Sequence, residues 1–390
     1  MLKLRAKNAQ ALYTIVQSLF WLTHGLMFAF AAVYLQKRGF SSGGTGAVLG
    51  CAYALSALLQ PAIASLFSRR HIAVEQGMCA VHGIVIALSL LLLLLPLSGL
   101  GVALLIVPLF SLEYALQPCV DTLARRWTSM GCKVDYGASR GLGSLLYAGM
   151  TAGMGLLLQR LSPLLLPLFY LVTLALSVAI LWILDVPKTA DAIEDKSSTA
   201  AGARQAAVHR SRFALFLAGV GCVSLGHVLV ENFMLQIMQA IGGNSGHLGI
   251  AISIASLVEF PAMLMYSRLS GRFGAGRLLI FSAWAWAAKN LLILIARAPA
   301  MIYLAEILQF ASYGIYIPAS IEYVAQIFSE RELLKGQSLV GSAYTVGCVA
   351  ATFMGGLLLD LVGVRGTLLA TLGVTLLGAC LFLFAVGRRR

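Results

Sequence analysis

Charged residues inside long apolar stretches are the positions in this sequence where chemistry is expected. An ionised side chain in a bilayer is costly unless it pairs or faces water, and such groups mark ion and substrate pathways. Lys289 is the clearest example, because it stands in WAWAAKNLLILIA (284–296), between the distant Arg277 and Arg297. At ~1.5 Å of rise per residue, it lies deep inside any helix that joins those arginines. The residues of this kind are Glu113, Asp121, Arg140, Glu231, Glu259, Lys289, Glu306 and Glu322.

Glu259 is the first candidate for an acid that carries a proton. It precedes Phe260-Pro261, shares a helix face with Ser253 and Ser256, and has no cation nearby in the sequence. A carboxylate isolated in a medium of low dielectric constant favours its protonated form, so it can load a proton at neutral pH. The alternative is a neutral glutamic acid that caps a proline-interrupted helix.

Arg140 opens the stretch GLGSLLYAG and is a candidate for binding solute. The preceding apolar segment carries Glu113, Gln117 and Asp121 at i, i+4 and i+8, which share one helix face. Paired with one of these carboxylates, Arg140 could bind hydroxyls or a carboxylate of a solute. Two alternatives remain: Arg140 snorkels to the membrane surface, and Asp121 forms a gate salt bridge with the arginines that follow it.

Aromatic and polar side chains recur along the first apolar segment. Gln17, Trp21, His24 and Phe28 follow helical spacing. In a helix that lines a cavity, such a stripe forms a wall on which a sugar or another ring stacks, and elsewhere it is ordinary packing. With the tyrosines of later segments, these residues suggest a polar ligand with a ring face. The residues expected to bind solute are Trp21, His24, Gln117, Arg140, Tyr147, Glu231, Tyr313 and Tyr344.

His227 and Glu231, at i and i+4, could belong to a metal site or to a simple hydrogen-bonded pair. Further ligands are lacking nearby, so the hydrogen bond is the better interpretation. The 7 cysteines are scattered singly, without a CxxC motif. Neither a metal site nor a disulfide is therefore expected.

The composition indicates the elements that must position these groups. Of the 390 residues, 59% are hydrophobic and 11% are charged, and the mean hydropathy is +0.88. This is typical of an all-α polytopic membrane protein. The first apolar segment is too long and too aromatic for a cleaved signal peptide, so it is expected to span the membrane. The twelve expected transmembrane helices cover approximately residues 9–36, 43–67, 73–96, 99–124, 138–160, 163–185, 211–238, 247–268, 278–297, 299–327, 336–360 and 366–387.

Most Lys and Arg residues fall in loops on the side of both termini. By the positive-inside rule, both termini of a multi-pass protein of the cytoplasmic (inner) membrane are then expected to be cytoplasmic. The net charge of +13 then reflects topology and attraction to anionic lipid head groups, not binding to nucleic acid.

One long polar segment divides the chain. Residues 188–212 (KTADAIEDKSSTAAGARQAAVHRSR) have mixed charge and few bulky apolar side chains, as in a flexible cytoplasmic linker. The expected domains are an N-terminal six-helix bundle over 1–187 and a C-terminal six-helix bundle over 213–390.

The two halves repeat each other at a nearly constant offset. LSALLQPAIASLFSRR around Pro61 matches IASLVEFPAMLMYSRL around Pro261, and SLEYALQPCVDTLAR around Pro118 matches SYGIYIPASIEYVAQ around Pro318. A six-helix offset preserves topology, so these are parallel repeats about an axis along the membrane normal. Such repeats form the two pseudo-symmetric halves of major facilitator transporters.

The chain resembles the major facilitator superfamily over essentially its whole length. More narrowly, it is similar to the oligosaccharide/nucleoside:proton symporter group around lactose permease, through YGASRGLGS, VEFP and LQFASYGIYIPASIEYVAQIF. The superfamily's signature after the second helix is reduced to SLFSRRH, without its Asp. The resemblance implies a monomer, a solute site near the bilayer midplane between the halves, and a sugar-binding role for Arg140.

The tenth helix of this chain departs from that group. In members of the group, the tenth helix carries a His and a Glu that serve proton coupling. Gln309 and Ser312 stand at those positions here. The proton relay is therefore expected to have moved to Glu259, Glu306 or Glu322, unless coupling differs.

Lys289 matches the basic residue that this group places in its ninth helix. We predict that it pairs with one of those three carboxylates, and that protonation of the partner releases the lysine as a two-state electrostatic switch. The alternative is that Lys289 snorkels toward the level of Arg297, ~12 Å along the helix.

These expectations describe a secondary active transporter that works by alternating access. It would carry a small polar solute (a sugar, oligosaccharide or nucleoside) together with protons, and would use the proton gradient and no cofactor. Its partners would be the solute and membrane lipid. A drug or metabolite efflux antiporter is the alternative, disfavoured because the fifth helix, SRGLGSLLYAGMTAGMGLLLQ, is glycine-rich without proline. A membrane enzyme is less favoured, since GxSxG and phosphate-loop motifs are missing. A membrane sensor that transports no solute is also less favoured.

Overall fold

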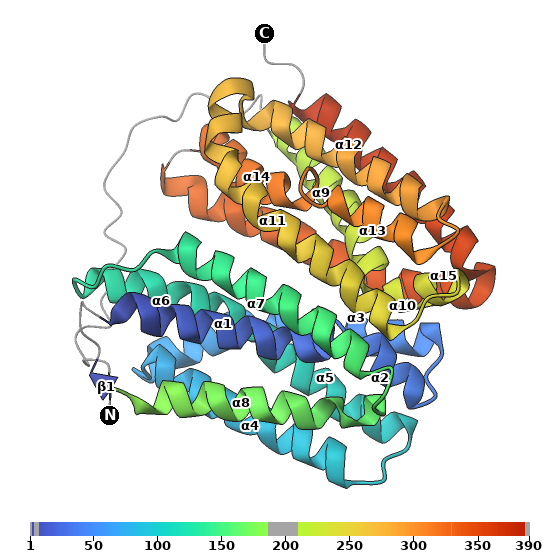
Figure 1. Ribbon diagram of the computed structural model, residues 1–390. Helices are drawn as coiled ribbons and strands as arrows, with labels where there is room; N and C mark the ends of the chain where they lie inside the picture. The colour runs from blue at the N-terminus through green and yellow to red at the C-terminus, as the bar shows by residue number, and fades with distance from the viewer. Residues whose placement is uncertain (1, 4–7, 186–209, 329, 387–390) are drawn as a thin grey trace. The chain divides into compact units, whose positions relative to one another are not determined.

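The computed structural model describes residues 2–3, 8–185, 210–328 and 330–386. The chain divides into two compact units, unit 1 over Met1–Glu194 and unit 2 over Asp195–Arg390. Both are helical, and Figure 1 shows their helices in chain order. The expected linker 188–212 lies outside the described residues up to position 209.

Unit 1 is built from long helices with two short strands at its ends. α1 packs against α7 and α8, α3 packs against α5, and α4 packs against both α5 and α8. Residues Leu2–Lys3 (β1) pair in parallel with Leu184–Asp185 (β2). The helices are α1 (Ala9–Phe28), α2 (Ala31–Lys37), α3 (Ser42–Arg69), α4 (Val74–Leu94), α5 (Gly99–Ala115), α6 (Gln117–Ser129), α7 (Tyr136–Leu157), the 3₁₀ helix η1 (Pro163–Leu165) and α8 (Leu166–Ile183).

Unit 2 repeats this plan with α9 packed along α15, and with α12 packed against α14 and α15. α15 contains two helices that meet at Gly363, whose φ of 70° interrupts the helical backbone. Glycine adopts this left-handed region without the steric penalty that a Cβ would impose. The helices are α9 (Arg210–Asn232), α10 (Met234–Ala240), α11 (Ser245–Phe273), α12 (Ala275–Leu294), α13 (Pro299–Ile307), α14 (Tyr313–Ile327) and α15 (Glu330–Val386).

Helix interruptions recur at matching places in the two units. The first long helix of each breaks shortly before a seven-residue helix, between α1 and α2 and between α9 and α10. The fourth expected span of each unit also breaks, between α5 and α6 near Pro118 and between α13 and α14 before Pro318. Pro118 stands in the first turn of α6, where its missing N–H costs no helical hydrogen bond, whereas Pro318 lies inside α14, beyond the break.

Nine segments of the described chain are long and apolar enough to cross a membrane, and one of them, Lys335–Val386, holds both helices of α15. Two expected spans are not among the nine. Over 138–160, the glycines and polar side chains of α7 lower its hydropathy, and 299–327 is divided into α13 and α14. The helical membrane fold is confirmed, and the count of twelve crossings stays a prediction.

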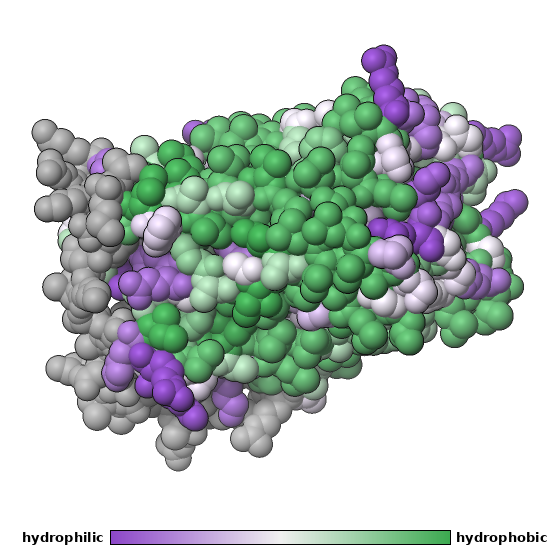
Figure 2. Space-filling model, turned by 90° about the horizontal axis from the view of Figure 1, so that it is seen from below, coloured by the Kyte–Doolittle hydropathy of each residue, from purple (hydrophilic) through white to green (hydrophobic). Residues whose placement is uncertain are grey.

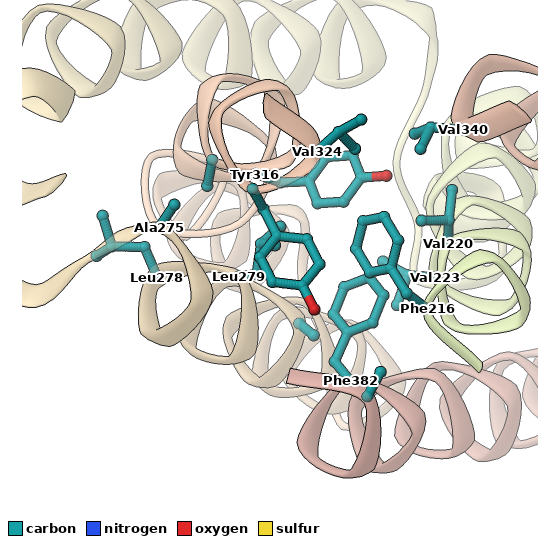
Figure 3. Close-up of a cluster of buried hydrophobic side chains, with 14 of the residues drawn as sticks. Phe216, Val220, Val223, Ala275, Leu278, Leu279, Tyr316, Val324, Val340 and Phe382 are labelled. Carbon is teal, nitrogen blue, oxygen red and sulfur yellow. The ribbon is translucent and has the colours of Figure 1, made fainter. Parts of the chain in front are cut away.

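The surface and the core are both apolar, as a lipid environment requires. Figure 2 shows hydrophobic side chains over most of the face in view, with hydrophilic ones gathered toward its ends. Large apolar side chains such as Trp182 are strongly exposed. Inside unit 2, α9, α12, α14 and α15 bury a cluster that includes Phe216, Leu279, Tyr316 and Phe382 (Figure 3).

Candidate functional site

Lys289 is held inside unit 2 by two partners. It lies on α12 with its side chain 3% exposed, and its Nζ donates to Glu306 Oε2 and to Gln309 Oε1, each at 2.7 Å. Glu306 lies near the end of α13 and is equally buried. The ammonium therefore ends in an ion pair inside the unit, not at the membrane surface as snorkelling would require.

Gln309 connects this ion pair to a second carboxyl group. It sits in the break between α13 and α14, and its Nε2 donates to Glu259 Oε1 at 2.9 Å. The amide thus accepts from Lys289 and donates to Glu259. The break is what turns this side chain inward, and we call Lys289, Glu306, Gln309 and Glu259 the lysine network. From the sequence, Gln309 is expected on one helix face with Glu306, three residues earlier, but it is assigned no role in coupling because it departs from a family pattern.

Glu259 lies on α11, where α14 approaches closely. A Cβ built on Gly314 of α14 would meet the Cβ of Ala262 at 2.6 Å and the Cα of Glu259 at 3.5 Å. Only glycine permits this approach. Glu259 is itself partly exposed, unlike Lys289 and Glu306, so it is the member of the lysine network with access to its surroundings.

An aromatic and histidine group lies beside the lysine network. His227 Nε2 is 3.4 Å from Glu231 Oε1 one turn along α9, and the Glu231 side chain is 50% exposed. The His227 ring lies 5.0 Å from the Tyr313 ring and 5.3 Å from the Trp286 ring, measured between centroids. The expected His–Glu contact is present, and among the described residues no three His, Cys, Asp or Glu side chains gather as metal ligands.

Arg140 and Trp21 form the centre of a second group, in unit 1. The Arg140 guanidinium carbon lies 3.8 Å from the Trp21 ring centroid, and Nη1 donates to Ser144 Oγ at 2.7 Å. A cation over an aromatic face is attracted by the ring quadrupole. Tyr147, one turn beyond Ser144 on α7, packs on Gly25, where a Cβ would meet the Tyr147 ring at 2.3 Å.

A run of rings in stacked and edge-to-face contact continues from Trp21 along α1. His24 lies 5.4 Å from Trp21 and 4.1 Å from Phe28 between ring centroids, and Phe28 lies 4.1 Å from Tyr114. Three buried polar atoms in this run have no hydrogen-bond partner among the residues that the structure describes: Gln17 Nε2, Trp21 Nε1 and His24 Nδ1. Buried polar groups are nearly always paired, so these atoms are available to a polar ligand.

The structure separates the carboxylates expected to share a face before Arg140. α5 ends at Ala115, and Glu113, fully buried, packs against His82 of α4 instead of facing Arg140. Gln117 begins α6, and Asp121 accepts a hydrogen bond from Tyr136 at 3.1 Å. The expected polar stripe is interrupted because the helix breaks at Leu116.

Two further predicted residues lie apart from these groups. Glu322, near the end of α14, accepts hydrogen bonds from Tyr266 at 2.5 Å and from Ser270 at 2.6 Å. Of the three carboxylates offered to Lys289, the structure thus brings Glu306 to it directly, Glu259 through Gln309, and Glu322 not at all. Tyr344 lies partly buried on α15, where its backbone carbonyl accepts from Ser224 of α9.

Comparisons with known proteins agree with a transporter fold. Residues 12–370 match the model of the MFS_1 like family. The maltose permease of Geobacillus stearothermophilus is 25% identical over 395 residues, which cover 99% of this chain and 96% of that protein. Multidrug resistance protein 2 of Bacillus subtilis is 26% identical over 147 residues, which cover 37% of this chain and 36% of that protein.

Solved structures of transporters are similar in fold. The match to a crystal structure of the nucleoside transporter NupG covers 98% of this chain and 100% of the NupG chain, with a TM-score of 0.81 and 15% identity. A bacterial homolog of the human lysosomal transporter Spinster covers 97% of this chain and 96% of its own, with a TM-score of 0.65 and 15% identity. At these identities the likeness shows the fold alone.

Proposed function

Because the chain belongs to the MFS_1 like family and is a transporter of the major facilitator superfamily, we propose that it is a proton-coupled symporter. It moves a small polar solute by alternating access, with the proton gradient as its energy source. The observation that carries this proposal is the lysine network, in which a carboxyl group is joined through an amide to a buried ion pair.

The charges of the lysine network favour Glu259 as the proton carrier. Lys289 and Glu306 neutralise each other at 2.7 Å, so ionisation of Glu259 makes the net charge of the network negative by one. Proton uptake by Glu259 removes that charge without breaking the Lys289–Glu306 pair. Because the Gln309 amide group is a donor toward Glu259, it can bond a carboxylate oxygen or the carbonyl oxygen of the acid. Glu259 can therefore cycle between its two forms in one geometry.

A proton on Glu306 would act differently. It would remove the negative charge beside Lys289 and leave an ammonium group, with a side chain only 3% exposed, hydrogen-bonded to neutral groups only. An unpaired buried charge is strongly unfavourable. Loading Glu259 and passing its proton toward Glu306 would thus convert a stable arrangement into an unstable one, which is how a two-state switch is driven.

The group around Arg140 and Trp21 supports a solute with hydroxyl groups and a ring face. The guanidinium supplies donors beside an aromatic ring, and the buried Trp21 Nε1 and His24 Nδ1 have no hydrogen-bond partner in the described part of the chain. Sugars and nucleosides present both features. Two related proteins carry such solutes in their names, a maltose permease and a nucleoside transporter. We therefore propose a sugar, oligosaccharide or nucleoside as the substrate class.

An efflux antiporter is the second candidate, because a multidrug resistance protein matches part of the chain. We favour symport, since the maltose permease matches 99% of the chain and the multidrug protein 37%. In either case, the distribution of Lys and Arg favours a cytoplasmic membrane protein with both termini in the cytoplasm, and a monomer remains the expected state.

The test is solute-evoked proton movement in proteoliposomes that contain the full chain. An external pH dye is followed while sugars, oligosaccharides and nucleosides are added in turn, with protein-free vesicles as the control. Symport predicts that one solute makes the external medium more alkaline as protons enter with it. External acidification on solute entry would favour exchange, and no response to any solute, with insertion verified, would contradict proton coupling.

A further inference from the structure

A second buried acid–histidine pair lies in unit 1, apart from both groups described above. His82 of α4 and Glu113 of α5 are 1% and 0% exposed, and His82 Nε2 lies 3.7 Å from Glu113 Oε2. Tyr170 of α8 is also 0% exposed, and its hydroxyl interacts electrostatically with the Glu113 carboxyl group. Three helices, of which α4 packs on both α5 and α8, thus each contribute one titratable group to the same place.

The polar atoms of these three side chains lack good hydrogen bonds. Both ring nitrogens of His82, both carboxyl oxygens of Glu113 and the Tyr170 hydroxyl have no partner of full hydrogen-bond geometry among the described residues. A buried ion needs such partners, because the attraction between two charges rarely offsets their loss of hydration. The neutral form, with a carboxylic acid beside a neutral imidazole, avoids this penalty.

Neighbouring charges do not compensate an ion at this place. Glu75 of α4 pairs with Arg126 at 2.6 Å and accepts from Trp127 at 3.0 Å, and it lies ~10 Å from His82 along the helix. Cys79 of α4 points to the Val178 carbonyl of α8. His24 of α1 and Tyr53 of α3 also lie near α5. Both contact Tyr114 of α5 and not Glu113. Since no neighbouring charge of the described residues compensates an ion here, the three side chains stay neutral only if a proton remains bound to them.

A small cavity gives His82 room for exchange. Its volume is about 10 Å³, and Ser177 of α8 and Phe20 of α1 are among its lining residues. This is about the space that one water molecule occupies, and a water needs polar neighbours. His82 and Ser177 supply them, so the imidazole is the member of the group that can pass a proton onward.

We propose that His82, Glu113 and Tyr170 form a second proton-binding site, inside unit 1 and independent of the lysine network. Glu113 holds the proton as a carboxylic acid, and His82 is its exchange partner. On release, the O–H bond of the acid breaks, the proton passes to His82 and then to water, and a carboxylate stays behind among apolar side chains. The proton therefore stabilises the packing of α4, α5 and α8, and its loss loosens these helices.

Infrared difference spectroscopy of the full chain in lipid, recorded between acidic and alkaline pH, tests this site without a solute. A protonated carboxyl group has its own carbonyl stretch, and we expect this band to disappear as the pH rises. Glu113→Gln should remove the Glu113 part of the band. Tyr170→Phe, which keeps the shape of the side chain, should shift it, because the hydroxyl faces the acid. Glu259→Gln is the matched control and should leave the Glu113 band in place.

Thermal unfolding of the same samples supplies the second readout. A group that binds its proton more tightly in the folded state stabilises the protein less as pH rises. The wild type should lose stability toward alkaline pH, and Glu113→Gln should lose less over the same range. Spectra of Glu113→Gln and Tyr170→Phe that both superimpose on the wild-type spectrum would overturn the proposal. Should Glu113→Gln fail to fold, the Tyr170→Phe spectrum decides alone.

Discussion

Lys289 and Glu306 form an ion pair at 2.7 Å in which both side chains are less than 5% exposed, across the packed surfaces of α12 and α13. A pair so deeply buried is weak evidence for stability, since hydration is lost by both ions, but each ion becomes indispensable to the other. This asymmetry makes the pair suitable for a switch: it is stable when complete, and unstable when a proton removes one partner's charge.

The first prediction concerns that dependence. Lys289→Gln and Glu306→Gln should each destabilise the protein by about 3–5 kcal/mol, because each leaves an unpaired buried charge. The double variant should lose much less than the sum, since neither charge remains. Thermal unfolding in detergent measures this, with the exposed Arg297→Gln as the control. Additive losses in the double variant would mean that the two residues act independently, and full transport with unchanged pH dependence in Lys289→Gln would contradict the switch.

A second prediction tests the bridge. Gln309→Met keeps the length of the side chain but removes both the acceptor for Lys289 and the donor for Glu259. Lost hydrogen bonds to charged groups cost about 1–3 kcal/mol each. Glu259, no longer joined to the ion pair, should still bind and release protons, but its protonation should no longer drive solute transport. The measurement is solute uptake against pH, whose dependence should weaken. Gln326→Met, which removes a bond to Glu322 on α14, serves as the control, and equal effects in both variants would argue against the bridge.

The ring over Arg140 carries a third prediction. Trp21→Ala removes the face that lies 3.8 Å from the guanidinium, and the lost cation–π attraction of about 0.5–2 kcal/mol should weaken solute affinity up to about thirtyfold. Trp21→Phe should retain part of it. Affinity for the solute identified by the proteoliposome assay is measured by equilibrium binding. Trp182→Phe, at a 78% exposed position, should have no effect, and an unchanged affinity in Trp21→Ala would remove this group from the solute site.

Close helix packing at Gly314 gives a fourth prediction. A Cβ there would lie 2.6 Å from that of Ala262, and neither atom can rotate away, so α11 and α14 must separate. Overpacking of this kind costs about 1–3 kcal/mol. Gly314→Ala should therefore lower the unfolding temperature and also impair coupling at Glu259. Gly341→Ala is the matched control, because a Cβ at that position meets nothing within 4 Å.

Sequence reasoning predicted the class of fold well, because a bilayer imposes long apolar segments that can be counted directly. It also identified Lys289, since a lone cation in WAWAAKNLLILIA requires an explanation. The family resemblance is confirmed by the match over residues 12–370. The repeat of Pro118 at Pro318 has a structural counterpart in the matching helix breaks.

The partner of Lys289 could not be chosen from the sequence. Glu259, Glu306 and Glu322 all lie on suitable helices, and the choice depends on helix rotation and on the break after Ile307, which no periodicity reveals. Gln309 was not predicted to take part in proton coupling, because a neutral amide at that position indicates the loss of a titratable residue.

His82 escaped notice for a similar reason. It stands alone in an apolar stretch, and only the packing of α4 on α5 brings it to Glu113. Glu113 was in turn assigned to the face of Arg140, because an unbroken helix was assumed through Leu116. Contacts between residues far apart in the chain depend on packing that local sequence patterns do not encode.

The account rests on Glu259 as the proton carrier, and one pair of assays on Glu259→Gln tests it. The amide keeps a carbonyl oxygen for Gln309 but can neither gain nor lose a proton at neutral pH. We predict that Glu259→Gln in proteoliposomes still exchanges labelled solute across the membrane at equal concentrations, while an imposed proton gradient no longer drives accumulation. Glu322→Gln, outside the lysine network, should retain both activities. Gradient-driven accumulation at the wild-type level in Glu259→Gln would contradict the assignment.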